Sequence, residues 1–189
     1  MTSEDGSVTS KQQNFDDIWR RLESAPKRQR DPFRTPVLAT VHQNQEPACR
    51  VVVLRRANAA KRTLTVYTDS ASEKCRALEE NPQVAFTFWD PRKRLQVRLT
   101  GTAELNVGES VSTEFRNQSP EARKLYQITP EPGQVIQSPS HLAFDGPIRF
   151  AKMNVIVSKV DALWLLRPIH QRIRASWTND AWSLEWVVP

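Results

Sequence analysis

The sequence predicts a mainly β protein in which antiparallel strands and a few inserted helices form a closed or split β-barrel. Many short runs rich in β-branched and aromatic residues are separated by turn signals, with 13 prolines and 5 glycines in 189 residues. One run alternates clearly, because Leu95, Val97 and Leu99 share one face and polar side chains share the other. Closure of the sheet would remove the exposed edges that so many strands leave.

The first predicted element is an amphipathic helix that starts at Asn14. Apolar residues recur at helical spacing (Phe15, Ile18, Trp19 and Leu22), and Asn14 is suited to cap the helix. Residues 1–13 are polar and aperiodic, which predicts a disordered tail before a single domain over 14–189.

The strands are expected next. Runs rich in β-branched and aromatic residues predict strands over 35–41, 49–55, 63–68, 83–89, 94–105, 149–166, 170–177 and 181–188. A helical, proline-interrupted section is expected over 109–125, and "TND" at 178–180 is suited to a hairpin turn between the last two strands.

Charge and composition restrict the partners. The formal net charge is +6, yet only "PKRQRDPFR" (26–34) is densely basic, and it lacks the interleaved aromatics of a single-strand binding surface. We read that segment as a solvated charged face and do not expect a nucleic-acid partner. The sequence has neither a membrane-spanning apolar run nor the pattern of a signal peptide, so a soluble, cytoplasmic protein is expected. Cys49 and Cys75 lack the spacing of a metal site or a disulfide framework.

The stretch "YTDSASEKCRALEENP" (67–82) predicts an anion site at the start of a short helix. Ser70 and Glu73 have the spacing of a capping box, and Pro82 ends the helix. Hydroxyl groups and Lys74 gather where free backbone N–H groups and the helix dipole favour a phosphate. Capping explains Ser70 and Glu73, but it does not explain Lys74.

The strand "CRVVVLR" supplies further basic groups. Arg50 is the stronger partner for Lys74, because arginine makes bidentate contacts with phosphate oxygens. Arg50 and Arg55 are five positions apart and fall on opposite faces of a regular strand, so both reach one ligand only through a bulge or a strand end.

These motifs together resemble a known family. "CRVVVLR", "LTVYTDSASEKCRALEENPQVAFTFWDP" and "RLQVRLTGTAEL", in this order and spacing, are similar to the FMN-binding split barrel of the pyridoxamine 5′-phosphate oxidase family. The C-terminal "IHQRIRASWTNDAWSLEWVVP" is similar to the last segment of that family, so the resemblance covers roughly Phe33 to Pro189.

The resemblance implies a homodimer with FMN at the subunit interface. It implies that Arg50 and Lys74 hold the FMN phosphate with Thr68 and Ser72, and that Gln96 reaches the flavin ring. The cofactor-binding residues that it implies are Arg50, Val51, Val52, Val53, Arg55, Tyr67, Thr68, Ser72, Lys74, Gln96, Gln137, Ser138, Trp164 and Arg172. Of these, Trp164 and Arg172 would lie near the isoalloxazine, and Gln137 and Ser138 would come from the other subunit.

The sequence departs from the family pattern mainly on the substrate side. Glu73 stands where relatives often have arginine, and Arg55 stands where the oxidases have lysine. The oxidases carry Arg-x-His where this chain reads Pro168-Ile169-His170, which leaves His170 as the one candidate catalytic residue. The residues that grip the substrate phosphate in the oxidases are not placed in "TEFRNQSPEARKLYQ".

Three functions follow as hypotheses. The leading one is an FMN-dependent oxidoreductase that oxidises a pyridoxamine or pyridoxine phosphate, or another small phosphorylated substrate, with dioxygen as acceptor. The second is a flavin-bound reductase with a nicotinamide donor, which needs no dinucleotide-binding fold of its own. The third is a basic binding protein without catalysis.

Overall fold

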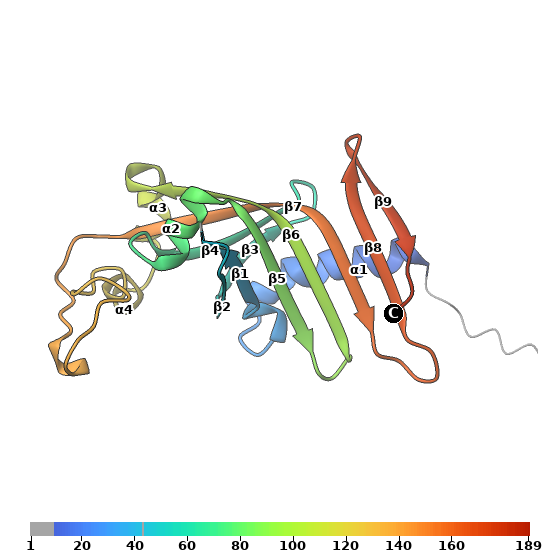
Figure 1. The fold of residues 1–189 in the computed structure, drawn as a ribbon, viewed down its shortest axis with the longest axis horizontal. Coiled ribbons are helices and arrows are strands. Elements are labelled where there is room, and N and C mark those ends of the chain that lie inside the picture. The colour runs from blue at the N-terminus through green and yellow to red at the C-terminus, as the bar shows by residue number, and fades with distance from the viewer. Residues whose placement is uncertain (1–9, 43) are drawn as a thin grey trace, which may run out of the picture.

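The computed structural model describes residues 10–42 and 44–189, and its described strands form one antiparallel sheet in the order β2-β1-β5-β6-β7-β4-β3 (Figure 1). The β8–β9 hairpin continues the sheet from β7. The strands are β1 (Val37–Val41), β2 (Pro47–Val51), β3 (Leu54–Asn58), β4 (Thr63–Asp69), β5 (Gln83–Asp90), β6 (Leu95–Val107), β7 (Phe150–Trp164), β8 (Gln171–Thr178) and β9 (Ala181–Trp186). The predicted mainly β architecture with inserted helices is therefore confirmed.

The sheet curls around one apolar core. Leu38 of β1, next to one edge of the sheet, and Leu54 of β3, at the other edge, belong to the same buried cluster as Phe86 and Leu99 of the central strands. The alternating pattern predicted for β6 is present, since Leu95, Val97 and Leu99 are buried while Arg98 and Thr100 are exposed. The sheet thus has a core face and an outer face, and successive side chains along a strand lie on alternate faces.

Helix α1 (Lys11–Ser24) covers the open side of the core. It buries the four apolar residues that its sequence spacing predicted, and Trp182 of β9 packs against Phe15 with ring centroids 5.1 Å apart. The predicted start at Asn14 is wrong, because the hydroxyl of Ser10 accepts a hydrogen bond from the Gln13 N–H and the helix begins at Lys11. Of the predicted disordered tail, residues 1–9 lie outside the described residues, while 10–13 form this cap and first turn.

The single strand predicted over 49–55 is wrong, because the chain turns a corner there. β2 ends at Val51 and pairs with β1, whereas β3 begins at Leu54 and pairs with β4. At the corner the Val52 N–H donates to the Pro36 carbonyl (3.0 Å), and the register shifts between Leu54 and Arg56. The corner carries the sheet around the core.

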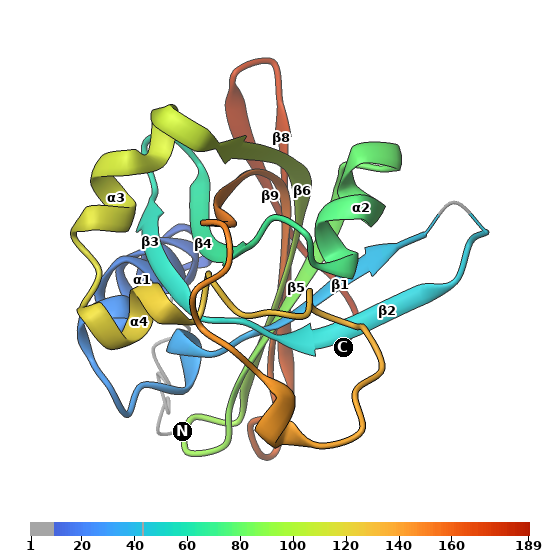
Figure 2. The ribbon, with the colours of Figure 1, turned by 90° about the vertical axis from the view of Figure 1, so that its left-hand side faces the viewer.

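Short helices fill the connections. Helix α2 (Glu73–Glu80) lies beside the β1–β2 hairpin (Figure 2). The helical section predicted over 109–125 is present as three pieces: η3 (Gly108–Val111), α3 (Ser112–Arg116) and α4 (Pro120–Lys124). The remaining 3-10 turns are η1 (Ala25–Lys27), η2 (Pro32–Arg34) and η4 (Pro139–His141). Among the residues the structure describes, none of the helices has the length and apolar character needed to cross a membrane.

Gly101 allows β6 and β7 to remain paired through a bulge. The register shifts between Thr100 and Gly101, and a Cβ at Gly101 would lie 2.2 Å from the Ile156 carbonyl oxygen. We expect Gly101→Ala to lower the free energy of unfolding by about 3 kcal/mol, because backbone must move. Denaturant titration measures the effect.

Gly108→Ala is the matched control, because a Cβ there meets open space and only the positive φ of +67° opposes it. Its cost is expected to be about 1 kcal/mol. Equal losses for the two variants would contradict the role given to the close approach at Gly101.

Candidate functional site

The turn between β4 and α2 gathers hydroxyl groups around one lysine. Lys74 Nζ donates to Thr68 Oγ1 at 3.0 Å, and the hydroxyls of Thr68 and Ser72 lie 3.4 Å apart. Both hydroxyl residues are buried, at 7% and 6% exposure. β4 delivers Thr68 to the turn, and Ser72 is the N-cap residue of α2, so the strand end and the helix start converge on Lys74.

Arg50 joins this group from the β1–β2 hairpin. Its Nη1 donates to Thr40 Oγ1 (2.7 Å) and to the Ala48 carbonyl (2.9 Å), and its guanidinium is near enough to Lys74 for its charge to act on the pKa of that lysine. We call Arg50, Thr68, Ser72 and Lys74 the anion cluster. The structure brings together the four residues predicted to hold a phosphate.

The anion cluster is electrostatically prepared for a negative ligand. Burial is the main cause that lowers the pKa of Lys74, and the nearby positive charge of Arg50 also lowers it, while Cys75, Asp69 and Glu73 oppose the shift without cancelling it. Within residues 10–42 and 44–189, neither cation has an ion-pair partner. Two close cations without a counter-ion favour an anion such as a phosphate.

The predicted capping box of Ser70 and Glu73 is wrong. The Asp69 carboxylate accepts a hydrogen bond from the Ala71 N–H (2.8 Å) and its carbonyl accepts from the Ser72 N–H (3.1 Å), so Asp69 shapes the turn instead. Glu73 is 64% exposed at its side chain and lies 3.2 Å from His42 Nε2. The carboxylate of Glu73 therefore contacts the β1 side of α2 and makes no hydrogen bond within the anion cluster.

Arg149 is a residue of this region that the sequence did not indicate. It is 8% exposed, and its Nε lies 3.2 Å from both carboxylate oxygens of Asp69. Its Nη2 donates to the Ile128 carbonyl. Asp69 and Arg149 are 80 positions apart, and no local pattern could have paired them.

Arg55 occupies a second polar position, beyond the corner at Val52. Its guanidinium carbon lies 5.6 Å from the ring centroid of Tyr67. Burial raises the pKa of Tyr126, and the charge and hydrogen bond of Arg55 partly offset this effect. The Nε of Arg55 is buried without a partner in the described structure. At the corner, Val51 is exposed, Val52 is buried and Val53 is half-buried.

Gln96 and Arg172 share the outer face of the sheet. Both are aligned with Leu163 of β7, Gln96 from β6 and Arg172 from β8. Asp161 accepts from Arg172 (3.0 and 2.9 Å) and from Arg98 (2.8 Å). Burial alone would raise the pKa of Asp161, but these hydrogen bonds and charges hold it below its ordinary value. Asp161 thus fixes Arg172 as a cation on the same face as Gln96, with β7 between the two residues.

Trp164 lies on the other face. It is aligned with Leu95 and Gln171, packs against the core, and lines a cavity of about 510 Å³ bounded by α1. The structure therefore does not bring Trp164 together with Gln96 and Arg172 within one chain.

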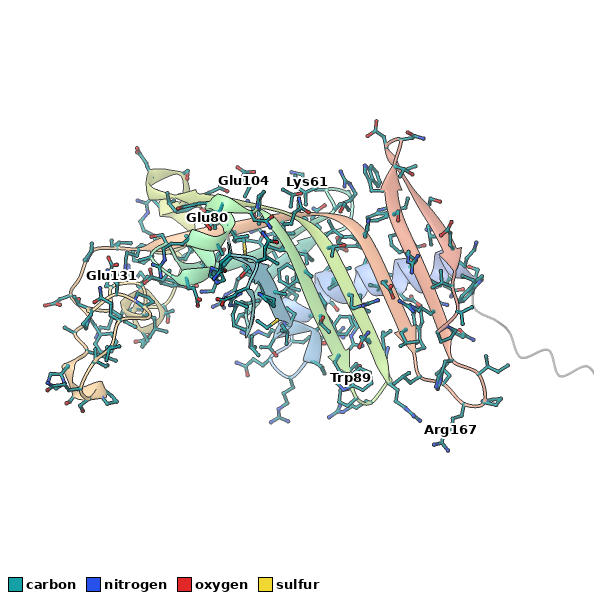
Figure 3. All side chains as sticks on the ribbon, viewed as in Figure 1. Lys61, Glu80, Trp89, Glu104, Glu131 and Arg167 are labelled. Atoms are coloured by element: carbon teal, nitrogen blue, oxygen red, sulfur yellow. The ribbon has the colours of Figure 1, made fainter. Side chains whose placement is uncertain are left out.

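The remaining predicted residues lie in two loops. Gln137 and Ser138 belong to the loop between α4 and β7, where the Ser138 hydroxyl accepts from the Ser140 N–H (3.3 Å). His170 is exposed in the β7–β8 loop, with Nδ1 2.7 Å from the Leu166 carbonyl. Glu131 of the first loop and Arg167 of the second lie at opposite ends of the molecule in Figure 3. No group of His, Cys, Asp and Glu suited to a metal ion occurs in the described part of the chain.

Comparisons with known proteins show which family the chain is similar to. Residues 16–107 match the family model described as pyridoxamine 5′-phosphate oxidase, FMN-binding domain. A pyridoxine/pyridoxamine 5′-phosphate oxidase of Haemophilus influenzae is 28% identical over 166 residues, which cover 80% of this chain and 78% of the relative.

Two solved structures share the fold over nearly the full length. A pyridoxamine 5′-phosphate oxidase-related, FMN-binding protein of Nostoc punctiforme has a TM-score of 0.73 at 23% identity, with 97% of this chain and 99% of the other covered. PhzG of Burkholderia lata, solved with tetrahydrophenazine-1-carboxylic acid, has a TM-score of 0.74 at 16% identity, with 100% and 98% covered. The predicted family resemblance, the antiparallel split-barrel fold and FMN as the cofactor of the domain are confirmed.

The lowered pKa of Lys74 predicts that cofactor affinity depends on pH. A bound phosphate would favour the ammonium form, so the pKa of Lys74 is higher in the bound state than in the free state. FMN affinity is expected to fall as the pH rises through the lowered pKa of free Lys74, in the alkaline range below 10.5. Fluorescence titration of FMN at several pH values measures the dependence.

Lys74→Arg is the control for this titration, because arginine stays charged throughout the range. The variant should bind with an affinity that is nearly independent of pH there. An equal pH dependence in both proteins would show that another group titrates.

Proposed function

We propose that this chain, a relative of the pyridoxamine 5′-phosphate oxidase-like FMN-binding split-barrel proteins, is an FMN-dependent oxidoreductase that works as a homodimer. The observation that carries the proposal is the anion cluster, in which two cations and two buried hydroxyls converge without a counter-ion in the described residues. Its residue types and its place at the start of α2 fit the FMN phosphate.

The phosphate end of the cofactor would be held by the anion cluster. Arg50 would supply planar N–H donors from the hairpin, and Lys74 would supply an ammonium that Thr68 already orients. Ser72 presents both its hydroxyl and the free N–H groups that follow an N-cap residue. Arg55, whose Nε is buried without a partner in the described structure, would meet the cofactor or substrate beside Tyr67.

The ring end of the cofactor would be completed by a second copy. Gln96 and Arg172 lie on the outer face of the sheet, while Gln137 and Ser138 lie in the loop after α4. One chain presents these groups on separate surfaces, as the positions of Glu131 and Arg167 illustrate (Figure 3). A dimer that packs outer face and loop against a partner would bring them to one flavin. Trp89, 43% exposed on the outer face and aligned with Gln96, supplies apolar area for such an interface.

The flavin would supply hydride acceptance, and the protein would orient the ring and shape the substrate pocket. On the substrate side, the Leu166 carbonyl can only accept a hydrogen bond, so the neutral ring of His170 would carry its proton on Nδ1 and leave Nε2 as an acceptor. His170 is therefore suited to receive a hydrogen bond or a proton from the substrate. We propose a small phosphorylated substrate, such as pyridoxamine or pyridoxine 5′-phosphate, and dioxygen as the final acceptor.

A second candidate is a reductase that takes electrons from a nicotinamide. The observation that favours it is Pro168, which stands where the oxidases have an arginine that contacts the substrate. Proline offers neither a side-chain nor a backbone N–H donor to the substrate. This candidate keeps the same cofactor site and differs only in what approaches the flavin.

The cofactor proposal is tested by colour and by two variants. The purified protein should be yellow and should release FMN on denaturation. Arg50→Ala and Lys74→Ala should each weaken FMN binding by about tenfold or more, because each removes charge-assisted hydrogen bonds. Isothermal titration of the apoprotein measures the affinities.

Arg92→Ala and Lys61→Ala are matched controls, because both side chains are exposed and lie outside the anion cluster. Each should bind FMN within about twofold of the unmodified protein. Losses as large as those of the cluster variants would mean that the phosphate is bound elsewhere.

The substrate proposal is tested by turnover. With pyridoxamine 5′-phosphate and dioxygen, the protein is expected to form hydrogen peroxide, and His170→Ala should lower the rate without changing FMN affinity. Absence of peroxide at high enzyme concentration, together with bleaching of the flavin by NADH or NADPH, would reject the oxidase and favour the reductase.

A further inference from the structure

We propose that Asp69 and Arg149 are positioning residues that set the geometry of the anion cluster and join it to the loop between α4 and β7. The inference rests on the proposed function, since it takes the anion cluster as the FMN phosphate site. Neither residue belongs to the cluster, and each acts through the groups that it holds.

Asp69 determines the path of the chain between Thr68 and Ser72. Its carboxylate accepts from the Ala71 N–H at 2.8 Å, and its carbonyl accepts from the Ser72 N–H at 3.1 Å and from the Cys75 thiol at 3.3 Å. These bonds fix where α2 begins relative to the end of β4. The spacing between the hydroxyls of Thr68 and Ser72 therefore depends on Asp69.

Arg149, the residue before β7, holds Asp69 in place. Its Nε contacts both carboxylate oxygens at 3.2 Å, and its backbone carbonyl accepts from the Ser70 N–H at 2.7 Å. The side chains of the pair are 8% and 11% exposed. Because the pair is buried, loss of either charge leaves the other without compensation, and the turn must rearrange.

Arg149 also anchors the base of the loop. Its N–H donates to the Tyr126 carbonyl at 2.9 Å, and its Nη2 donates to the Ile128 carbonyl. The loop that begins there carries Gln137 and Ser138, which the proposed function assigns to the cofactor of the other subunit. One buried ion pair thus connects the turn that would bind a chain's own FMN with the loop that would serve its partner's FMN.

Binding of two ligands, FMN and riboflavin, can distinguish a positioning role for Asp69 and Arg149 from a role in general stability of the fold. Riboflavin has the same ring system as FMN but lacks the phosphate. A displaced anion cluster should weaken binding of FMN and leave binding of riboflavin nearly unchanged, whereas general loosening of the fold should weaken both. The informative measurement is therefore the ratio of FMN affinity to riboflavin affinity.

The experiment compares Asp69→Asn and Arg149→Met with the unmodified full-length protein, by titration of each apoprotein with FMN and with riboflavin. Both variants should lose about tenfold or more in FMN affinity. Asp69→Asn should lose less than about twofold in riboflavin affinity, whereas Arg149→Met should lose more, because it also releases the loop that would serve the partner's flavin, but by a smaller factor than for FMN. Lys152→Met and Glu114→Gln are the matched controls, since they break an ion pair of 2.6 Å between β7 and α3 that does not contact the turn. In each control, the ratio of FMN affinity to riboflavin affinity should equal that of the unmodified protein.

An unchanged ratio in the Asp69 and Arg149 variants, or an equal change in the controls, would overturn the inference. If the two variants fail to fold, Arg149→Lys replaces them, because lysine keeps the buried charge but cannot contact Asp69 and Ile128 together. Arg149→Lys should lower the ratio about threefold or more, and an unchanged ratio would again reject the proposal. If the unmodified protein does not bind FMN, the proposed function itself fails, which is a separate result.

Discussion

The antiparallel pairing of β6 with β7 is the constraint on which the other parts of the structure depend. It runs from the Leu95–Trp164 pair to the Val107–Ala151 pair and passes the bulge at Gly101. One end of β7 begins beside β4 and the anion cluster, and the other end leads into β8 and Arg172. The two regions that would meet the phosphate and the ring are therefore held at a fixed separation by one continuous pair of strands. Because the two regions lie near opposite ends of β7, one flavin could meet both kinds of region only if a second copy supplied one of them, as the proposed dimer would.

Much of the fold follows from residue patterns. Two patterns predict which side chains are buried: the alternation in 94–105 and the helical spacing of Phe15, Ile18 and Trp19. The apolar residues of both patterns are buried in the structure. The corner at Val52 could not be predicted in this way, because an apolar strand and an apolar corner have the same composition. The start of α1 does not follow from the sequence, because Ser10 and Asn14 can both cap a helix and only the structure shows that Ser10 does so.

The site was predictable where its residues are close in sequence and not where they are distant. Thr68, Ser72 and Lys74 lie within one turn of chain, so their convergence follows from a strand followed by a helix. The pairing of Asp69 with Arg149 depends on the register of β4 against β7, which no short motif records. Register also separates Trp164 from Arg172, because the β7–β8 hairpin aligns Arg172 with Leu163 and a shift of one residue would reverse the faces.

The anion cluster draws its two cations from separate segments, Arg50 from a hairpin and Lys74 from a helix. A ligand held by both would act as a non-covalent cross-link between the β1–β2 hairpin and the body of the sheet. By mass action such a cross-link stabilises the native state more as the ligand concentration rises. Without it, two like charges face each other across the junction and the hairpin is held by β1 pairing and packing alone. Resistance of the hairpin to proteases and to heat would then depend on how much cofactor the cell supplies.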